Sequence, residues 1–186
     1  MRTVLVILAL ALALWGCQPA PATVPSTDPQ LEKLLQDLRA AQSPVVAARL
    51  EQRVWERWGR SGSPTVDILM ERAAAAQARG EGELALQFLD AAARLAPGFA
   101  EPWHRKASIA YERQDRRAAL LAISETLARE PRHFGAWAGL GLIYEGLGRG
   151  EAALKAYEAA LAEHPHFQPA MEGRARLGRN NGGEEI

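Results

Sequence analysis

The stretch that decides the fold runs from Phe134 to Pro165 and reads FGAWAGLGLIYEGLGRGEAALKAYEAALAEHP. Small and large apolar residues recur in it at helical spacing, and the turn Gly148-Arg149-Gly150 divides it into two segments of helical length. Proline at its end stops the second segment, because a proline ring cannot continue a helix. The stretch therefore predicts two antiparallel helices in close contact.

The same pattern occurs three times along the chain. Pro97, Pro131 and Pro165 are spaced 34 residues apart, and they define repeats 66–99, 100–133 and 134–167. Two columns hold only small residues, at position 8 (Ala73, Ala107, Gly141) and position 20 (Ala85, Ala119, Ala153). Small residues let paired helices approach closely, so this period predicts an all-α solenoid of three helix pairs.

The pattern resembles the tetratricopeptide repeat family over residues 66–165. The third row matches that family at Trp137, Leu140, Gly141, Tyr144, Gly148, Ala153, Tyr157, Ala160 and Pro165. The tract 130–136 is also similar to short exported proteins of this family from alphaproteobacteria. The first two rows depart from the pattern at Arg72 and Lys106, where the family usually has an apolar residue. We expect their aliphatic stems to lie on the core while the charges reach water.

Helices are also predicted on both sides of the repeats. Asp28-Pro29 and Ser43-Pro44 are helix starts, and they predict an N-terminal helical pair within 29–65 that caps the first repeat. A further helix from Gln168 to Leu177 is expected to cap the other end. The repeat domain then spans 66–178, and 179–186 is expected to be a disordered tail.

The N-terminus has the features of an export signal. Arg2 precedes an apolar run from Val4 to Trp15, which is short for a membrane span and typical of a signal peptide over 1–16. Leu14, Gly16 and Cys17 resemble the lipobox of bacterial lipoproteins, which implies lipidation of Cys17, although Trp15 departs from that motif. Ordinary cleavage at 20–22 and a retained apolar anchor are the alternatives.

Residues 17–28 are rich in proline and are predicted to form an extended tether. A cleaved or merely disordered N-terminus fits this composition equally well. Together with the export signal, the tether predicts a periplasmic, membrane-anchored lipoprotein, or alternatively a soluble periplasmic protein.

Composition argues against several classes of function. The 22 basic and 22 acidic residues balance, whereas a nucleic-acid binder needs a basic excess. A single cysteine excludes a disulfide framework within the chain and a cysteine-based zinc site. The four histidines are interpreted as polar residues near helix ends, and no nucleophile or phosphate-loop motif is present. We therefore expect no enzyme activity, no cofactor and no metal.

The family resemblance places a concave groove along the first helix of each repeat. The residues that it implies for partner binding are Met70, Gln77, Glu101, His104, Arg105, Ser108, Tyr111, Leu142 and Glu145. The family's clamp for a peptide carboxylate is absent, because among its positions only Arg105 is basic. The expected function is an envelope adaptor that binds a protein segment with apolar anchors. A structural or homo-oligomerisation module of an envelope complex is the alternative, and the face could also be merely solvated.

Overall fold

The computed structural model describes residues 28–181, which form helices and connecting turns without a strand. The helices are α1 (Pro29–Arg39), α2 (Pro44–Trp58), α3 (Pro64–Ala78), α4 (Gly82–Leu95), α5 (Glu101–Glu112), α6 (Arg116–Arg129), α7 (Phe134–Gly146), α8 (Gly150–Glu163) and α9 (Gln168–Asn181). The predicted all-α class is confirmed. The predicted signal peptide, Cys17 and most of the tether lie outside the described residues.

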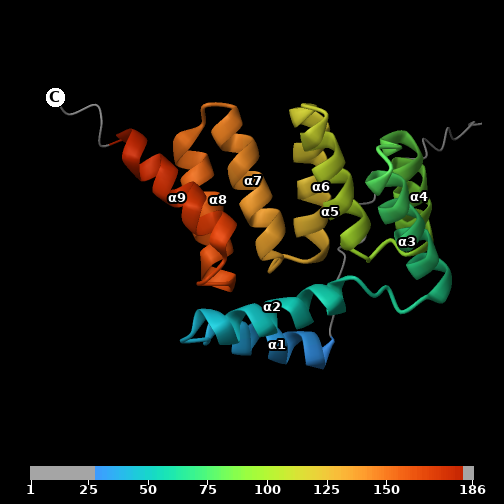
Figure 1. The fold of residues 1–186 in the computed structure, drawn as a ribbon, viewed down its shortest axis with the longest axis horizontal. Coiled ribbons are helices and arrows are strands. Elements are labelled where there is room, and N and C mark those ends of the chain that lie inside the picture. Colours follow the sequence, from blue (N-terminus) through green and yellow to red (C-terminus); the bar gives the residue numbers. More distant parts are fainter. Residues whose placement is uncertain (1–27, 182–186) are drawn as a thin grey trace, which may run out of the picture.

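Helices α3 to α8 form three antiparallel hairpins that stand side by side (Figure 1). The two small-residue columns are buried in these hairpins, at Ala73, Ala85, Ala107, Ala119, Gly141 and Ala153. A Cβ atom at Gly141 would lie 2.5 Å from the Tyr157 ring, so α7 and α8 are in contact there. The predicted solenoid of three helix pairs is therefore confirmed.

The three hairpin turns share one backbone conformation. Each contains a residue with positive φ, at Gly80 (75°), Gln114 (62°) and Gly148 (69°). The next residue in each turn donates its N–H at 2.9 Å to a carbonyl five residues earlier: Glu81 to Ala76, Asp115 to Ala110, and Arg149 to Tyr144. This bond belongs to the Schellman motif that ends many helices. The middle repeat makes this turn without glycine.

The N-terminal hairpin, α1 with α2, lies across one edge of the solenoid (Figure 1). Leu31, Leu34, Leu35 and Leu38 of α1 share a core with Phe134, Tyr157 and Phe167, which all belong to the third repeat. The expectation that this pair caps the first repeat is therefore wrong. The loops that follow α6 and α8 lead into Phe134 and Phe167, and these rings give the apolar face of the hairpin a partner.

Polar contacts also hold the N-terminal hairpin to this edge. Arg39 of α1 binds Glu163 at 2.5 Å, and Arg132 bridges Glu163 and Glu32 at 3.0 and 2.8 Å. All of these solenoid residues lie at or beside the loops between helices. The edge is thus matched to the hairpin by charge as well as by apolar area.

The charge of Lys106 does not extend into water, in contrast to the expectation from the sequence. Its Nζ donates to Asp90 Oδ1 at 2.6 Å and lies 4.3 Å from the centre of the Trp103 ring. The ammonium group is therefore paired with Asp90 of α4 and lies over the Trp103 ring, because the face of an aromatic ring attracts cations. Arg72, in contrast, is exposed.

Helix α9 packs against α8 and α7, as expected for a capping helix. It runs to Asn181, so residues 179–181, which the sequence assigned to a tail, are helical. Within residues 28–181, every helix is too short or too polar to cross a membrane.

Candidate functional site

The predicted groove follows α3, α5 and α7, and the structure divides its residues into exposed and covered groups. We define the open groove surface as Ala74, Gln77, Ser108 and Tyr111, which lie in the second halves of α3 and α5 and keep accessible side chains. Gln77 Nε2 donates to Glu112 Oε1 at 3.4 Å and so joins the two helices. Two consecutive repeats therefore present one shared surface.

Tyr111 is the aromatic residue of the open groove surface. It is 38% exposed, whereas its neighbour Ala110 is 8% exposed and occupies the position where the family has a core tyrosine. Tyr111 therefore does not replace that core residue. Its ring is available for contact with another molecule.

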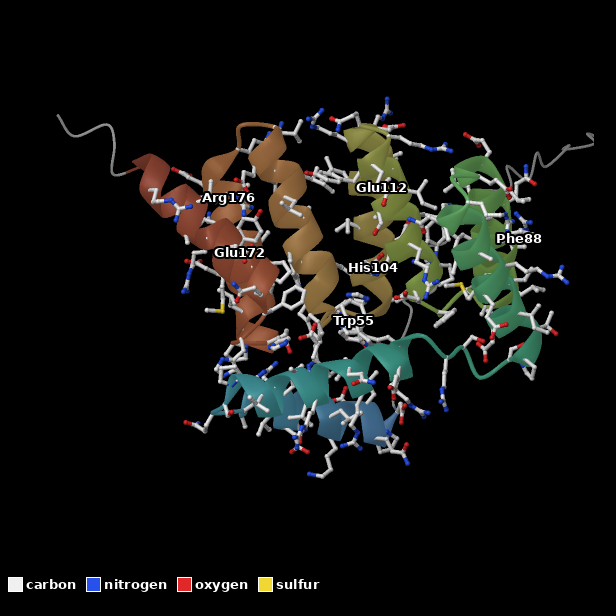
Figure 2. All side chains as sticks on the ribbon, in the orientation of Figure 1. Trp55, Phe88, His104, Glu112, Glu172 and Arg176 are labelled. Carbon is white, nitrogen blue, oxygen red and sulfur yellow. The ribbon has the colours of Figure 1, made fainter. Side chains whose placement is uncertain are left out.

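Three of the predicted groove residues serve the protein's own packing. Met70 is 3% exposed in the core of the first repeat, so its prediction as a partner-binding side chain is wrong. Leu142 packs against the core that contains α9. Glu145 accepts from the Tyr157 hydroxyl at 2.7 Å and from Arg176 at 3.0 Å (Figure 2 labels Arg176 on α9). The bond to Arg176 holds the pKa of the Glu145 carboxyl below its usual range. Helix α9 thus occupies this face in the third repeat.

Two tryptophans of α2, Trp55 and Trp58, form an aromatic layer that covers the start of α5. Trp55 stacks on His104 with ring centres 5.6 Å apart, and Figure 2 shows the two side chains facing each other. Trp58 stacks on His133 at 4.1 Å with the ring planes 7° apart. Trp58 Nε1 also donates to Glu130 Oε2 at 3.4 Å. His104, predicted to face a partner, is therefore covered by this chain's own tryptophan.

Glu101, another predicted groove residue, is buried in the same layer. Its Oε1 accepts from Arg105 Nε at 2.9 Å, so Arg105 is engaged as well. Its Oε2 lies 3.4 Å from His104 Nδ1 and 3.7 Å from His133 Nε2. Burial favours the neutral form of Glu101, but the two imidazole rings outweigh it and hold the pKa of the carboxyl well below its usual range.

His133 is completely buried and directly precedes α7. Its Nδ1 accepts from the Ala136 N–H at 3.0 Å, so His133 is the N-cap of α7 and lies at the N-terminal end of that helix. Burial, with a further contribution from His104, lowers the pKa of His133 to about 4, and the ring is neutral near pH 7. His164 does follow a helix, α8, as the sequence predicted, and its Nε2 lies 3.1 Å from Glu51 Oε2.

The meeting of Glu101 and His133 could have been predicted from their positions in the repeat. Glu101 holds the second position of the second repeat, and His133 holds its last position. In a helix hairpin the first and last residues lie at the same end, so these two side chains share the edge of the solenoid. Trp55 and Trp58 carried no such signal, because the docking site of their hairpin does not follow from a repeat register.

An open pocket of about 630 Å³ adjoins this edge. Its walls include Arg57 and Trp58 of α2, Arg129 and Glu130 at the end of α6, and Glu101. The pocket therefore connects solvent with the neighbourhood of the buried carboxylate.

Stacked helix hairpins with small residues at their contacts define a helical-repeat protein of the solenoid class. The sequence profile of the tetratricopeptide repeat family matches residues 104–182. A TPR repeat-containing protein of Rhizobium etli is 34% identical over 143 residues, which cover 77% of this chain and 70% of that relative. The chain belongs to the tetratricopeptide repeat family.

Solved structures share the fold at low sequence identity. The Arabidopsis OM64 TPR domain superposes with a TM-score of 0.59 at 20% identity, covering 62% of this chain and 96% of that domain. The MamA protein gives a TM-score of 0.57 at 20% identity, covering 83% of this chain and 82% of MamA. These similarities support the solenoid fold. Members of the tetratricopeptide repeat family, to which the chain belongs, typically mediate protein–protein interactions.

Proposed function

We propose that this protein is a non-catalytic adaptor or scaffold of the bacterial cell envelope that binds a segment of a partner protein through the open groove surface. The observation that carries the proposal is Tyr111, an exposed aromatic residue on the face by which this family binds proteins. An aromatic side chain buries much area on binding and has few rotatable bonds to fix. Ser108 and Gln77 supply polar groups beside it.

The chemistry of the groove favours a guest with apolar anchors. The clamp positions that grip a peptide carboxylate in this family hold Met70, Ala74, Arg105, Gly135 and Gly139. Arg105, the one basic residue among them, binds Glu101 at 2.9 Å. A terminal carboxylate would therefore find no unpaired cation at these positions, whereas an extended or helical segment could pack on Tyr111.

The proposed location rests on the sequence before residue 28. A lipid on Cys17 would hold the protein at a membrane, and the proline-rich tether would let the repeats stand clear of its surface. Replacing Cys17 by Ser and fractionating cells tests this. Movement of the protein from the membrane to the periplasmic fraction supports the anchor. A wild type that is already soluble and lacks acyl mass contradicts it.

Site-specific photo-crosslinking in cells tests the groove. A photoreactive residue at Ser108 should form a crosslink to a partner. Tyr111→Ala should lower the crosslink yield, because it should reduce the free energy of binding by about 1–3 kcal/mol. Tyr111→Ala should leave the melting temperature nearly unchanged, since the side chain is exposed. Absence of a crosslink at Ser108, or one that Tyr111→Ala does not affect, contradicts the proposal.

Exposed leucines on the second helices favour the alternative of a structural assembly module. Leu121 of α6 is 63% exposed and Leu95 at the end of α4 is 61% exposed. The same photoreactive residue at Leu121 is therefore the matched control. Crosslinks from Leu121 to a second copy of the chain, without crosslinks from Ser108, would replace the adaptor by a homo-oligomerisation module.

A further inference from the structure

Three ligand atoms of the type that binds transition metals converge beneath α2. Glu101 Oε2, His104 Nδ1 and His133 Nε2 all lie within 4.8 Å of one another. None of the three atoms has a hydrogen-bond partner among the described residues, and all are buried. Buried polar atoms are nearly always hydrogen-bonded, so three buried atoms that lack hydrogen bonds and lie this close together indicate a ligand.

We propose that Glu101, His104 and His133 bind a divalent transition-metal ion of the Zn²⁺ type, which ties the start of α5 to the N-cap of α7. A tetrahedral zinc ion with bonds of about 2.1 Å separates its ligands by about 3.4 Å. The observed separations from Glu101 Oε2 are 3.4 Å to His104 Nδ1 and 3.7 Å to His133 Nε2. Two of the three ligand separations are thus already close to what the ion requires.

The hydrogen bonding of the Glu101 carboxylate also fits a metal site. Glu101 Oε1 is occupied by Arg105 Nε at 2.9 Å, which orients the carboxylate and leaves Oε2 for the ion. Partners that orient ligands in this way are characteristic of metal sites.

The surroundings enclose this cluster and still give access to it. Trp55 covers His104 and Trp58 covers His133, so the ion would be shielded from competing ligands on the α2 side. The open pocket of about 630 Å³ includes Glu101 in its wall, so solvent reaches the immediate neighbourhood of the cluster. Two histidines and one carboxylate leave a fourth position for water.

Metal binding has a specific consequence for α7. Nδ1 of His133 now accepts from the Ala136 N–H, so the neutral ring carries its proton on Nε2. Coordination through Nε2 requires that proton to move to Nδ1, which then can no longer accept from Ala136. Binding of the ion therefore breaks the capping hydrogen bond from the Ala136 N–H and forms a coordination bond at Nε2. The Ala136 amide should then exchange its hydrogen with solvent faster than it does in the metal-free protein.

Isothermal titration with ZnCl₂ tests the proposal on the full-length protein carrying Cys17→Ser, a change that removes the single thiol. We expect one ion per chain, and faster exchange of the Ala136 amide in the loaded protein. Titration with Co²⁺ should give the visible absorption of a tetrahedral nitrogen and oxygen site. Absence of binding, or a Co²⁺ spectrum of octahedral type, overturns the proposal.

Variants assign the ligands. His104→Asn and His133→Asn should each weaken zinc binding by at least about tenfold. Asparagine is itself a good N-cap residue, so His133→Asn keeps the start of α7 while it removes the imidazole. His166→Asn is the matched control, because His166 lies outside the cluster and contacts the Ala41 carbonyl. Zinc binding that is equal in all three variants overturns the assignment. If His133→Asn fails to fold, the partly exposed His104 provides the decisive variant.

Discussion

Gln114 holds a backbone conformation that the other two repeats give to glycine. Its φ is 62°, against 75° at Gly80 and 69° at Gly148. A side chain in this left-handed region costs about 1–2 kcal/mol. We predict that Gln114→Gly raises the free energy of unfolding by about 0.5–1 kcal/mol, since relief of strain exceeds the added flexibility of the unfolded chain. Urea denaturation measures the change.

The reverse substitution in the third repeat is the natural comparison. Gly148→Gln places a side chain at the equivalent turn and should lower the free energy of unfolding by about 1 kcal/mol. Equal stability of the wild type and both variants would show that the turn conformation carries no strain.

The Tyr157 ring is held between two glycines. Cβ atoms at Gly141 of α7 and at Gly173 of α9 would lie 2.5 and 2.3 Å from the ring, on which the two helices converge. Because both sides are occupied by backbone, the ring has little room to shift. We predict that Gly141→Ala lowers the free energy of unfolding by about 1–3 kcal/mol, despite the better helix propensity of alanine.

Gly146→Ala is the control for this prediction. It lies on the same helix, but its added Cβ would meet only the guanidinium of Arg116, at 3.3 Å, and a flexible side chain can move. Thermal melts should show Gly146→Ala at or slightly above the wild type. A loss equal to that of Gly141→Ala would mean that the tyrosine contact does not limit the packing of α7.

The hairpin of α1 and α2 depends on a few large side chains for its docking. Trp58 is 6% exposed and contacts both His133 and Phe134, with ring centres 4.1 and 5.0 Å away. Trp58→Ala should cost about 3–5 kcal/mol, the usual loss for a buried aromatic residue in a core. Hydrogen exchange should then show faster opening of α1 and α2, while α3 and α4 remain protected.

Val45 gives the matched control on the same helix, because it is 63% exposed. Val45→Ala should change the stability by less than about 0.5 kcal/mol. If Trp58→Ala were equally mild, or if it destabilised α3 and α4 as much as α1 and α2, the hairpin would not be a separately docked element.

Burial of histidines makes the stability of the whole molecule depend on pH. Burial lowers the pKa of His164, Glu51 opposes this without cancelling it, and His166 lowers it further. In the unfolded chain the ordinary pKa is about 6.5. Below that pH the unfolded state takes up the proton more readily than the folded state. The free energy of unfolding should therefore fall as pH decreases below about 6.5 and stay constant above it.

His164→Gln isolates this contribution, since glutamine does not titrate. The variant should lose less stability between neutral pH and pH 5 than the wild type, by at most about 1.4 kcal/mol per pH unit. His133, whose pKa is lowered to about 4, contributes with the same sign and remains in the variant. Parallel pH profiles of the two proteins would contradict the assignment to His164.

The repeat fold was determined by local sequence. Prolines 34 residues apart and columns of small residues fixed the helix pairs and their order, because each repeat contacts mainly its neighbours. The sequence also identified Tyr111 as a candidate contact, and the structure leaves it exposed. It could not distinguish Tyr111 from Met70, because whether a first-helix residue faces the groove or the next hairpin depends on the rotation of that helix.

Only the tertiary structure decided where the N-terminal hairpin docks. The apolar face of this hairpin could pack on any surface of complementary shape, and the sequence does not show which surface has that shape. Phe134, Phe167 and the buried His133 create that surface at the edge of the solenoid. These residues lie 75 to 109 positions after Trp58 in the sequence and meet it only after the repeats have stacked. The convergence of Glu101, His104 and His133 follows from the same stacking, since it joins the first turn of one helix to the capping residue of another.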